Sequence, residues 1–227
     1  MYLKLIHIFV LLILFAFPCK ADAGDAASEA RESANHALRK FLTSVPLQDL
    51  QNHGFETKEE VEKAVVGQGF EIFSVDPKDI LDERPSKELQ QLIVTSNMWM
   101  FIVAVEDKPM TLVTVGYVDG EWRLYQFGTT KLAKTLSEFV SAWPPSSGYH
   151  YKYVEIRQAR TSFIQVFNGD KEIGIVPDLN LLGMIDGKKP KKYNPYELIS
   201  PHKILPAVAP AVKSNIENWN KKHKKDP

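Results

Sequence analysis

Cysteine is almost missing from this chain of 227 residues, since the only one is Cys19, close to the N-terminus. If a leader segment containing Cys19 is removed, the remaining chain has no thiol. That excludes disulfide bonds, a thiolate nucleophile and a cysteine zinc site. A domain without disulfides must be stabilised by its core alone, and about 200 residues are enough to bury such a core.

An excess of charge of either sign is also lacking. The 28 Lys and Arg residues balance the 28 Asp and Glu residues. Without Lys4, Lys20 and Asp22, which lie in the leader, 26 basic and 27 acidic residues remain. A chain with this balance does not carry the basic footprint of a nucleic-acid-binding protein, so we expect no nucleic acid as a general partner.

Long apolar runs are confined to the N-terminus. Lys4 precedes a run from Leu5 to Phe17 of about 13 residues, whereas a membrane-spanning helix needs roughly 20. The small residues of Ala21-Asp22-Ala23 follow, which completes the order of parts in a cleavable secretory signal. The sequence therefore predicts a signal peptide over 1–23, cleavage after Ala23 and an extracytoplasmic location, periplasmic or secreted. No transmembrane segment is expected after cleavage.

Cys19 raises an alternative, because a cysteine behind an apolar run can be a site of lipid attachment. Bacterial lipoprotein signals place a small residue immediately before the cysteine and usually Leu three residues before it. Here these positions hold Pro18 and Ala16. The pattern therefore favours cleavage, with Cys19 in the discarded segment.

Helical patterns occur at both ends and in the middle of a domain predicted over 24–219. Apolar stripes predict a helix over 24–44 and an amphipathic helix from Thr130 to about Trp143. A capping box formed by Thr57 and Glu60 starts a short helix that Gly67 is placed to end. A last helix is expected from Ser200 to about Trp219, kinked or split by its prolines, and the basic residues 220–227 form a disordered tail.

Strand patterns fill the remaining segments, at 70–75, 99–105, 110–117, 121–125, 149–157, 162–167 and 172–176. Asp119-Gly120 and Asn168-Gly169 supply the positive φ angles that tight hairpins need. Strands that follow one another through tight turns predict an antiparallel sheet, composed of a β-meander and a hairpin. The fold class is therefore α+β, with the amphipathic helix packed on the sheet and helices at the N- and C-terminal ends.

Motifs that carry catalysis or bind cofactors are not found. Ser200-Pro201-His202-Lys203 matches Ser-x-x-Lys but lacks the companion motifs, and a helix cap explains Ser200. Gly67-Gln68-Gly69 lies between a helix and a strand, the reverse of the order in a dinucleotide-binding fingerprint. The histidines are far apart in the sequence. We therefore expect no metal and no cofactor.

Two segments offer candidate contact surfaces. Tyr149, Tyr151 and Tyr153 alternate, so they would share one sheet face next to Trp143 and could stack on sugars or on a partner's apolar residues. They are also ordinary strand formers beneath a helix. The second surface is basic and consists of Lys188, Lys189, Lys191 and Lys192, together with Lys221, Lys222, Lys224 and Lys225 of the tail.

If the two lysine groups converge, they could hold an anionic surface, such as phospholipid headgroups or a cell-envelope polymer, with about 1 kcal/mol per lysine near a charged membrane. Solubility and disorder are the simpler explanation of such lysines. The sequence predicts an exported non-catalytic domain that binds an exported protein or an envelope ligand. An exported hydrolase that uses Asp, Glu or His is one alternative. An inhibitor or regulatory partner of another exported protein, recognised by an exposed edge strand, is the other.

Overall fold

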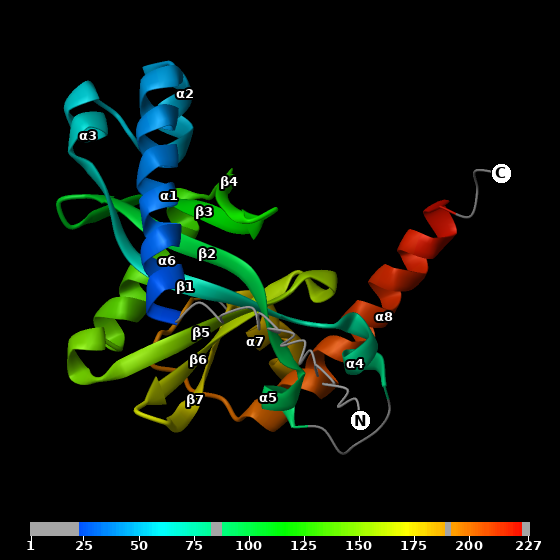
Figure 1. Cartoon of the computed structure of the whole chain (residues 1–227). Coiled ribbons are helices and arrows are strands. Elements are labelled where there is room, and N and C mark those ends of the chain that lie inside the picture. Colours follow the sequence, from blue (N-terminus) through cyan, green and yellow to red (C-terminus); the bar gives the residue numbers. More distant parts are fainter. Residues whose placement is uncertain (1–22, 83–87, 189–191, 224–227) are drawn as a thin grey trace, which may run out of the picture.

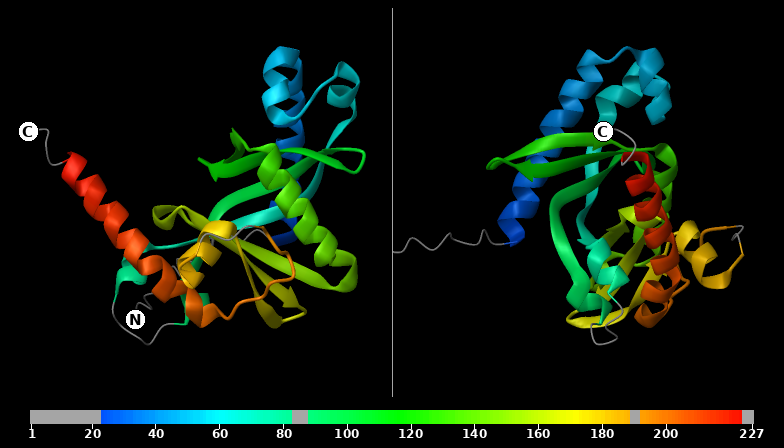
Figure 2. Two further views of the ribbon diagram at one scale, coloured as in Figure 1. Left: turned by 180° about the vertical axis from the view of Figure 1, so that it is seen from behind. Right: turned by 90° about the vertical axis from the view of Figure 1, so that its right-hand side faces the viewer.

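The computed structural model describes residues 23–82, 88–188 and 192–223. Over these residues the fold is α+β, and its centre is a seven-stranded sheet in the order β4-β3-β2-β1-β5-β6-β7, with helices packed on both faces (Figures 1 and 2). The predicted signal peptide up to Asp22, including Cys19, lies outside the described residues, and so does the polar connector at 83–87.

The strands are β1 (Ala64–Val75), β2 (Ile93–Val105), β3 (Lys108–Val118), β4 (Glu121–Phe127), β5 (Tyr149–Ile156), β6 (Thr161–Asn168) and β7 (Lys171–Pro177). The α-helices are α1 (Ala23–Ser44), α2 (Leu47–Leu50), α3 (Lys58–Lys63), α4 (Pro77–Leu81), α5 (Leu89–Leu92), α6 (Thr130–Ala142), α7 (Leu179–Asp186) and α8 (Ile204–His223). Short 3-10 turns are η1 (Gln51–His53), η2 (Pro145–Ser147), η3 (Arg157–Ala159) and η4 (Pro201–Lys203).

The sheet is mixed, and in this respect the prediction of an antiparallel sheet is wrong. Strands β1 to β4 pair antiparallel with their chain neighbours, as do β5 to β7. Between these two halves, β1 and β5 pair in parallel through Ile72–Tyr153, Phe73–Val154 and Ser74–Glu155. Tight turns determine only the pairing of consecutive strands, and the chain reaches β5 from β4 through α6, which permits the parallel direction.

Alternation along the strands divides the core between the two faces. On one side, α1 packs with Phe101 and Val103 of β2, in the cluster that also holds Val113 and Val115 of β3. On the other side, α6 buries Leu136 and Phe139 against a cluster containing Met100, Ile102, Tyr153 and Ile164. The residues of β5 and β6 that alternate with these, among them Val154, Ile156 and Phe163, pack with α8.

Strand β1 begins earlier than the sequence predicts. Helix α3 ends at Lys63, and Ala64 already pairs with Val105 of β2, so the predicted continuation of this helix to Gly67 is wrong. Val65, which falls within the predicted helix, is 55% exposed in the strand. The long β2 strand offers a hydrogen-bonding partner along its whole length, and sheet pairing with it outweighs the helical pattern of a short segment.

The hairpin turns differ in how well the sequence predicts them. Asp119 and Gly120 both have positive φ, at 53° and 86°, as the Asp-Gly pair predicts. In the second hairpin Asn168 pairs with Lys171, so the turn is Gly169-Asp170 rather than Asn168-Gly169. Gly169 takes the positive φ of 55° at the first turn position.

The C-terminal part contains more helix than expected. Helix α7 was not predicted, although Asp178 caps its start and Gly187, at a φ of 66°, ends it. Helix α8 is continuous, with Pro206 in its first turns and Pro210 in its interior. Its buried residues are Ile204, Val208 and Val212, and their packing holds the helix together across a proline that costs about 3 kcal/mol.

The predicted tail at 220–227 is helical through His223, where α8 ends, and Lys224 and Lys225 lie outside the described residues. In the described ranges no helix combines the length and the apolar composition that a membrane crossing requires.

Candidate ligand-binding surface

The predicted aromatic row lies beneath α6. Tyr153 is buried, and Tyr151 stacks on Phe70 with ring centroids 5.7 Å apart and meets Phe139 edge-on at 4.9 Å. Trp143 meets the ring of Tyr149 edge-on at 5.2 Å. The row therefore belongs to the packing between α6 and the sheet.

The polar ends of these aromatics are also engaged within the chain. The Tyr151 hydroxyl donates to the Trp143 carbonyl oxygen, and the Trp143 indole N–H donates to the Pro195 carbonyl oxygen at 2.7 Å. Burial raises the pKa of Tyr151 to about 12, and it also raises the pKa of Tyr153 above its ordinary value. The two hydrogen bonds tie the end of α6 to β5 and to the segment that contains Pro195.

The structure describes only some of the lysines in the two predicted basic groups. Lys188 follows α7, Lys192 lies beyond it, and both are exposed. Lys221 and Lys222 lie in the last turn of α8. Lys189 and Lys191 are outside the described residues.

Two pockets adjoin at the end of β5, where η3 turns the chain into β6. The first has a volume of about 310 Å³ and is lined by Tyr153, Glu155, Arg157, Arg160, Thr161, Ser162 and Asp178. The second has a volume of about 460 Å³ and is lined by Arg157, Gln158, Arg160, Asn215, Ile216, Asn218, Trp219 and Lys222. Both arginines belong to both pockets.

Two further pockets extend this hollowed region along α7. One of about 480 Å³ is lined by Ala159, Arg160, Leu179, Asn180, Gly183, Met184, Gly187 and Lys188. The other, of about 340 Å³, is lined by Thr129, Lys131, Leu132, Thr135, Asp178, Leu179, Asn180 and Tyr193. Because each pocket shares residues with a neighbour, the four form one surface, which we call the Arg160 surface.

The backbone that presents Arg160 is held from two sides. Arg160 has a φ of 53°, in the left-handed region that residues other than glycine rarely adopt. The Asn180 side chain of α7 donates to the Arg160 carbonyl oxygen at 3.1 Å, and the Asn215 side chain of α8 donates to the Gln158 carbonyl oxygen at 2.6 Å. Two helices therefore fix the loop on which both arginines sit.

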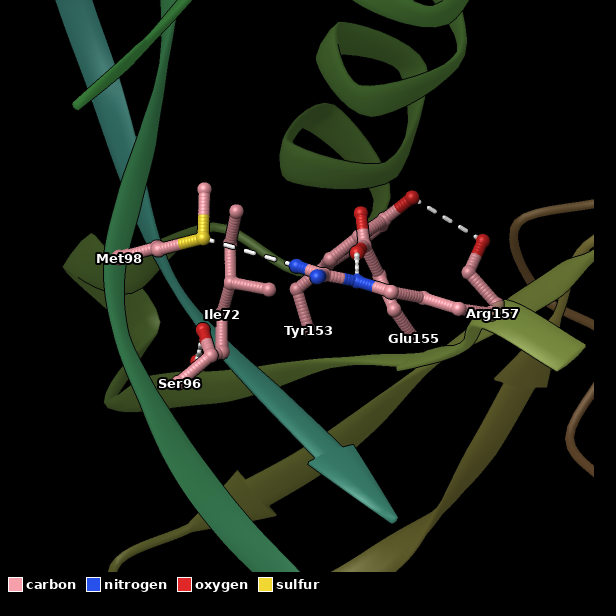
Figure 3. Close-up of polar contacts among 7 residues, drawn as sticks. Ile72, Ser96, Met98, Tyr153, Glu155 and Arg157 are labelled. Carbon is pink, nitrogen blue, oxygen red and sulfur yellow. Dashed lines mark hydrogen bonds and ion pairs between the residues drawn. The ribbon is translucent and has the colours of Figure 1, made fainter. Parts of the chain in front are cut away.

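The charges on the Arg160 surface are mostly positive. Its cations are Arg157, Arg160, Lys131, Lys188 and Lys222, against the two carboxylates Glu155 and Asp178. Arg157 is already paired, since its Nε donates to Glu155 Oε2 at 3.2 Å and its Nη2 approaches Met98 Sδ at 3.5 Å (Figure 3). Across the part of the chain that the structure describes, the Arg160 guanidinium has no carboxylate partner.

Both carboxylates are held by donors. Asp178 accepts hydrogen bonds from Thr161 Oγ1 at 2.6 Å, from Ser162 N at 2.7 Å and Oγ at 3.1 Å, and from Leu181 N at 2.7 Å. Ser162 Oγ in turn accepts from the Tyr153 hydroxyl at 3.0 Å. Glu155 is paired to Arg157, so both carboxylates of these pockets already have partners within the chain.

The edges of the sheet are partly occupied. At β7, Ile175 and Ile199 exchange backbone hydrogen bonds of 3.3 and 2.8 Å, so the segment before η4 covers this edge. At β4, Ser33 of α1 donates to the Trp122 carbonyl oxygen at 3.0 Å. Contacts from other segments therefore reach both edge strands, and most residues of β4 are exposed.

Among the described residues, no group of three or more His, Cys, Asp or Glu side chains is arranged to hold a metal ion. Comparison with protein-family models, with curated proteins and with solved structures gave no match for this chain. The interpretation of the Arg160 surface therefore depends on its own chemistry.

Sequence reasoning missed the two arginines at the centre of this surface. Arg157 and Arg160 stand three residues apart at the end of a strand pattern, and this was the only local signal. Lys188 and Lys222, which sequence reasoning did single out, line two pockets that both include Arg160.

Proposed function

We propose that this chain is an exported, non-catalytic domain that binds an anionic polymer of the cell envelope at the Arg160 surface. In this proposal the signal peptide 1–23 is removed after Ala23, and the domain acts outside the cytoplasm. One observation carries the proposal: four adjoining pockets are lined by five cations, whereas their two carboxylates already accept hydrogen bonds within the chain.

The identity of the central cation supports an anionic ligand. A guanidinium is planar, remains charged and presents paired donors that match a carboxylate or a phosphate. Arg160 is held on a fixed backbone by Asn180, and its guanidinium has no carboxylate partner among the described residues. A ligand anion would therefore gain a contact without displacing an existing ion pair.

The extent of the surface supports a polymer rather than a small ion. The pocket that contains Lys222 and the pocket that contains Lys188 both include Arg160. The pocket of Lys188 in turn shares Leu179 and Asn180 of α7 with the pocket that contains Lys131. A chain with repeated negative charges can occupy several of these pockets at once, and linked contacts raise the total affinity above that of each one.

The test compares a variant of the surface with a matched control far from it. Arg160→Asn removes the charge and keeps a residue that tolerates positive φ. Arg123→Asn removes an exposed arginine on β4, at the edge of the sheet that lies away from β5. Binding of the purified protein to polyphosphate, to oligogalacturonate and to neutral dextran would be measured by calorimetry at low and high salt.

We expect Arg160→Asn to weaken binding of both polyanions by roughly 10- to 100-fold, because one charge-assisted hydrogen-bonded contact contributes about 1.5–3 kcal/mol. Arg123→Asn should stay within about twofold of the unmodified protein, and added salt should weaken polyanion binding. Equal losses in the two variants, or equal binding of dextran, would show that the Arg160 surface is not the binding site.

The export step has a separate test. The intact mass of the protein recovered outside the cytoplasm should correspond to a chain that begins after Ala23. A recovered protein that retains Met1, or a mass showing lipid on Cys19, would contradict cleavage as proposed and would favour an anchor.

A further inference from the structure

Trp219 is an exposed aromatic side chain inside the second pocket. It lies in the last turns of α8, which extend away from the sheet (Figure 1), and 63% of its surface is exposed. His223 stacks on its indole ring, with centroids 3.8 Å apart and an interplanar angle of 18°. His223 therefore covers part of the indole, and the exposed remainder of the ring is accessible to a ligand in this pocket.

The neighbours of Trp219 in this pocket are of two further kinds. Arg157, Arg160 and Lys222 provide positive charge, and the side chains of Gln158 and Asn218 provide amide groups. A primary amide offers both donors and an acceptor, which suits adjacent hydroxyl groups. A flat aromatic face, amides and cations thus line a single volume of about 460 Å³.

This combination matches the parts of an acidic sugar. The C–H groups on one face of a pyranose ring are weakly positive and apolar, so they pack on the negative face of an indole. Its hydroxyls pair with amides, and its carboxylate or phosphate pairs with a guanidinium. A polyanion without sugar rings would use only the cations of the pocket.

We infer that the anionic polymer is an acidic glycan and that one of its sugar rings stacks on Trp219. This inference rests on the proposed function and adds the chemical class of the ligand to it. Trp219 supplies selectivity for a sugar ring, whereas Arg160 supplies attraction to any polyanion. The two side chains therefore make separable contributions.

The experiment titrates the purified protein with oligogalacturonate, with polyphosphate and with a single-stranded oligonucleotide of similar charge. The variants are Trp219→Ala, Trp219→Phe and Arg160→Asn. Tyr125→Ala is the matched control, because Tyr125 is an aromatic of similar exposure, 60%, on β4. Thermal unfolding of each variant verifies that it is folded, and removal of the exposed Trp219 side chain leaves the core unchanged.

We expect Trp219→Ala to weaken oligogalacturonate binding at least tenfold and to leave polyphosphate binding within twofold. Trp219→Phe should restore most of the sugar affinity, Tyr125→Ala should change neither ligand, and Arg160→Asn should weaken both. Equal effects of Trp219→Ala on both polyanions, or no effect on either, would overturn the sugar assignment. Tighter binding of the oligonucleotide would identify a base as the stacked group and would overturn it as well.

The same series separates the two proposals. If Arg160→Asn weakens polyphosphate binding but Trp219→Ala has no selective effect, the anionic site stands and the sugar assignment fails. If no polyanion binds to the unmodified protein, both fail together.

Discussion

The Asp178 carboxylate links β6 to α7 through hydrogen bonds, and replacement of Asp178 should be among the most destabilising changes of a polar residue in this protein. Its half-buried carboxylate caps α7 through Leu181 N and also accepts from Thr161 and Ser162. A hydrogen bond to a charged group contributes about 1.5–3 kcal/mol, and loss of a helix cap costs about 1 kcal/mol. These effects overlap, so we expect Asp178→Ala to lower the free energy of unfolding by about 3–5 kcal/mol.

Asp76→Ala provides the matched control. Asp76 also caps a helix, α4, but it is exposed, and among the described residues its side chain accepts only from Lys78 N, at 2.8 Å. Loss of this cap should cost about 1 kcal/mol. The two variants therefore differ in the number of donors left without a partner, while the residue type and the role at the helix start are the same.

Urea unfolding followed by circular dichroism measures both effects. The midpoint should fall much further for Asp178→Ala than for Asp76→Ala, with the dependence on urea concentration unchanged in both. If the two variants lose the same free energy within about 0.5 kcal/mol, the reasoning from the hydrogen bonds of Asp178 is refuted.

Two further predictions concern the core and its response to pH. Gly69→Ala should lower the free energy of unfolding by about 1–3 kcal/mol in urea, because the added Cβ would lie 2.5 Å from the buried Phe101 ring. Gly116→Ala is the control and should be neutral, because its Cβ would lie 3.5 Å from Met98. Equal losses in the two variants would contradict this packing. Burial raises the pKa of Tyr151 from 10.0 to about 12, so the folded state holds its phenol proton more tightly and stability should fall as pH rises from about 10 towards 12. Tyr151→Phe should reduce that fall, and an identical pH dependence in the variant would be inconsistent with a buried phenol.

Features determined by a few adjacent residues could be predicted from the sequence. Thr57 forms the predicted cap of α3, with its Oγ1 accepting from Glu60 N at 3.2 Å, because cap geometry depends on the residues at the helix start. Asp119 and Gly120 take positive φ because glycine has no Cβ and the short aspartate side chain tolerates this conformation. The same reasoning placed the second turn one residue early, since both Asn168-Gly169 and Gly169-Asp170 are suitable turn pairs.

Features determined by distant residues could not be predicted in the same way. Ala64 and Val65 continue the pattern of α3, and only the presence of β2 alongside makes them a strand. Ile72 and Tyr153 carry no mark of their parallel pairing. In α8, Pro210 indicates a break, yet burial of Val208 and Val212 maintains the helix.

The candidate site was predictable only in fragments. Lys188 and Lys222 stood out as members of basic runs, but nothing local indicates that both lie beside Arg160. Tyr149, Tyr151 and Tyr153 pack under α6, as ordinary strand formers do, and their alternation alone does not indicate how much of each side chain is covered. Tertiary packing decides both outcomes.

The parallel pairing of β1 and β5 has a consequence for the order of folding. Within each antiparallel half, contacts join strands that are near in the chain, whereas Ile72 and Tyr153 close a loop of about 80 residues, which is entropically costly. We expect the halves to acquire hydrogen-exchange protection first and the amides at their junction to acquire it last. The acidic and basic lining of the first pocket, which includes Glu155 beside that junction, would then be completed only when the two halves dock.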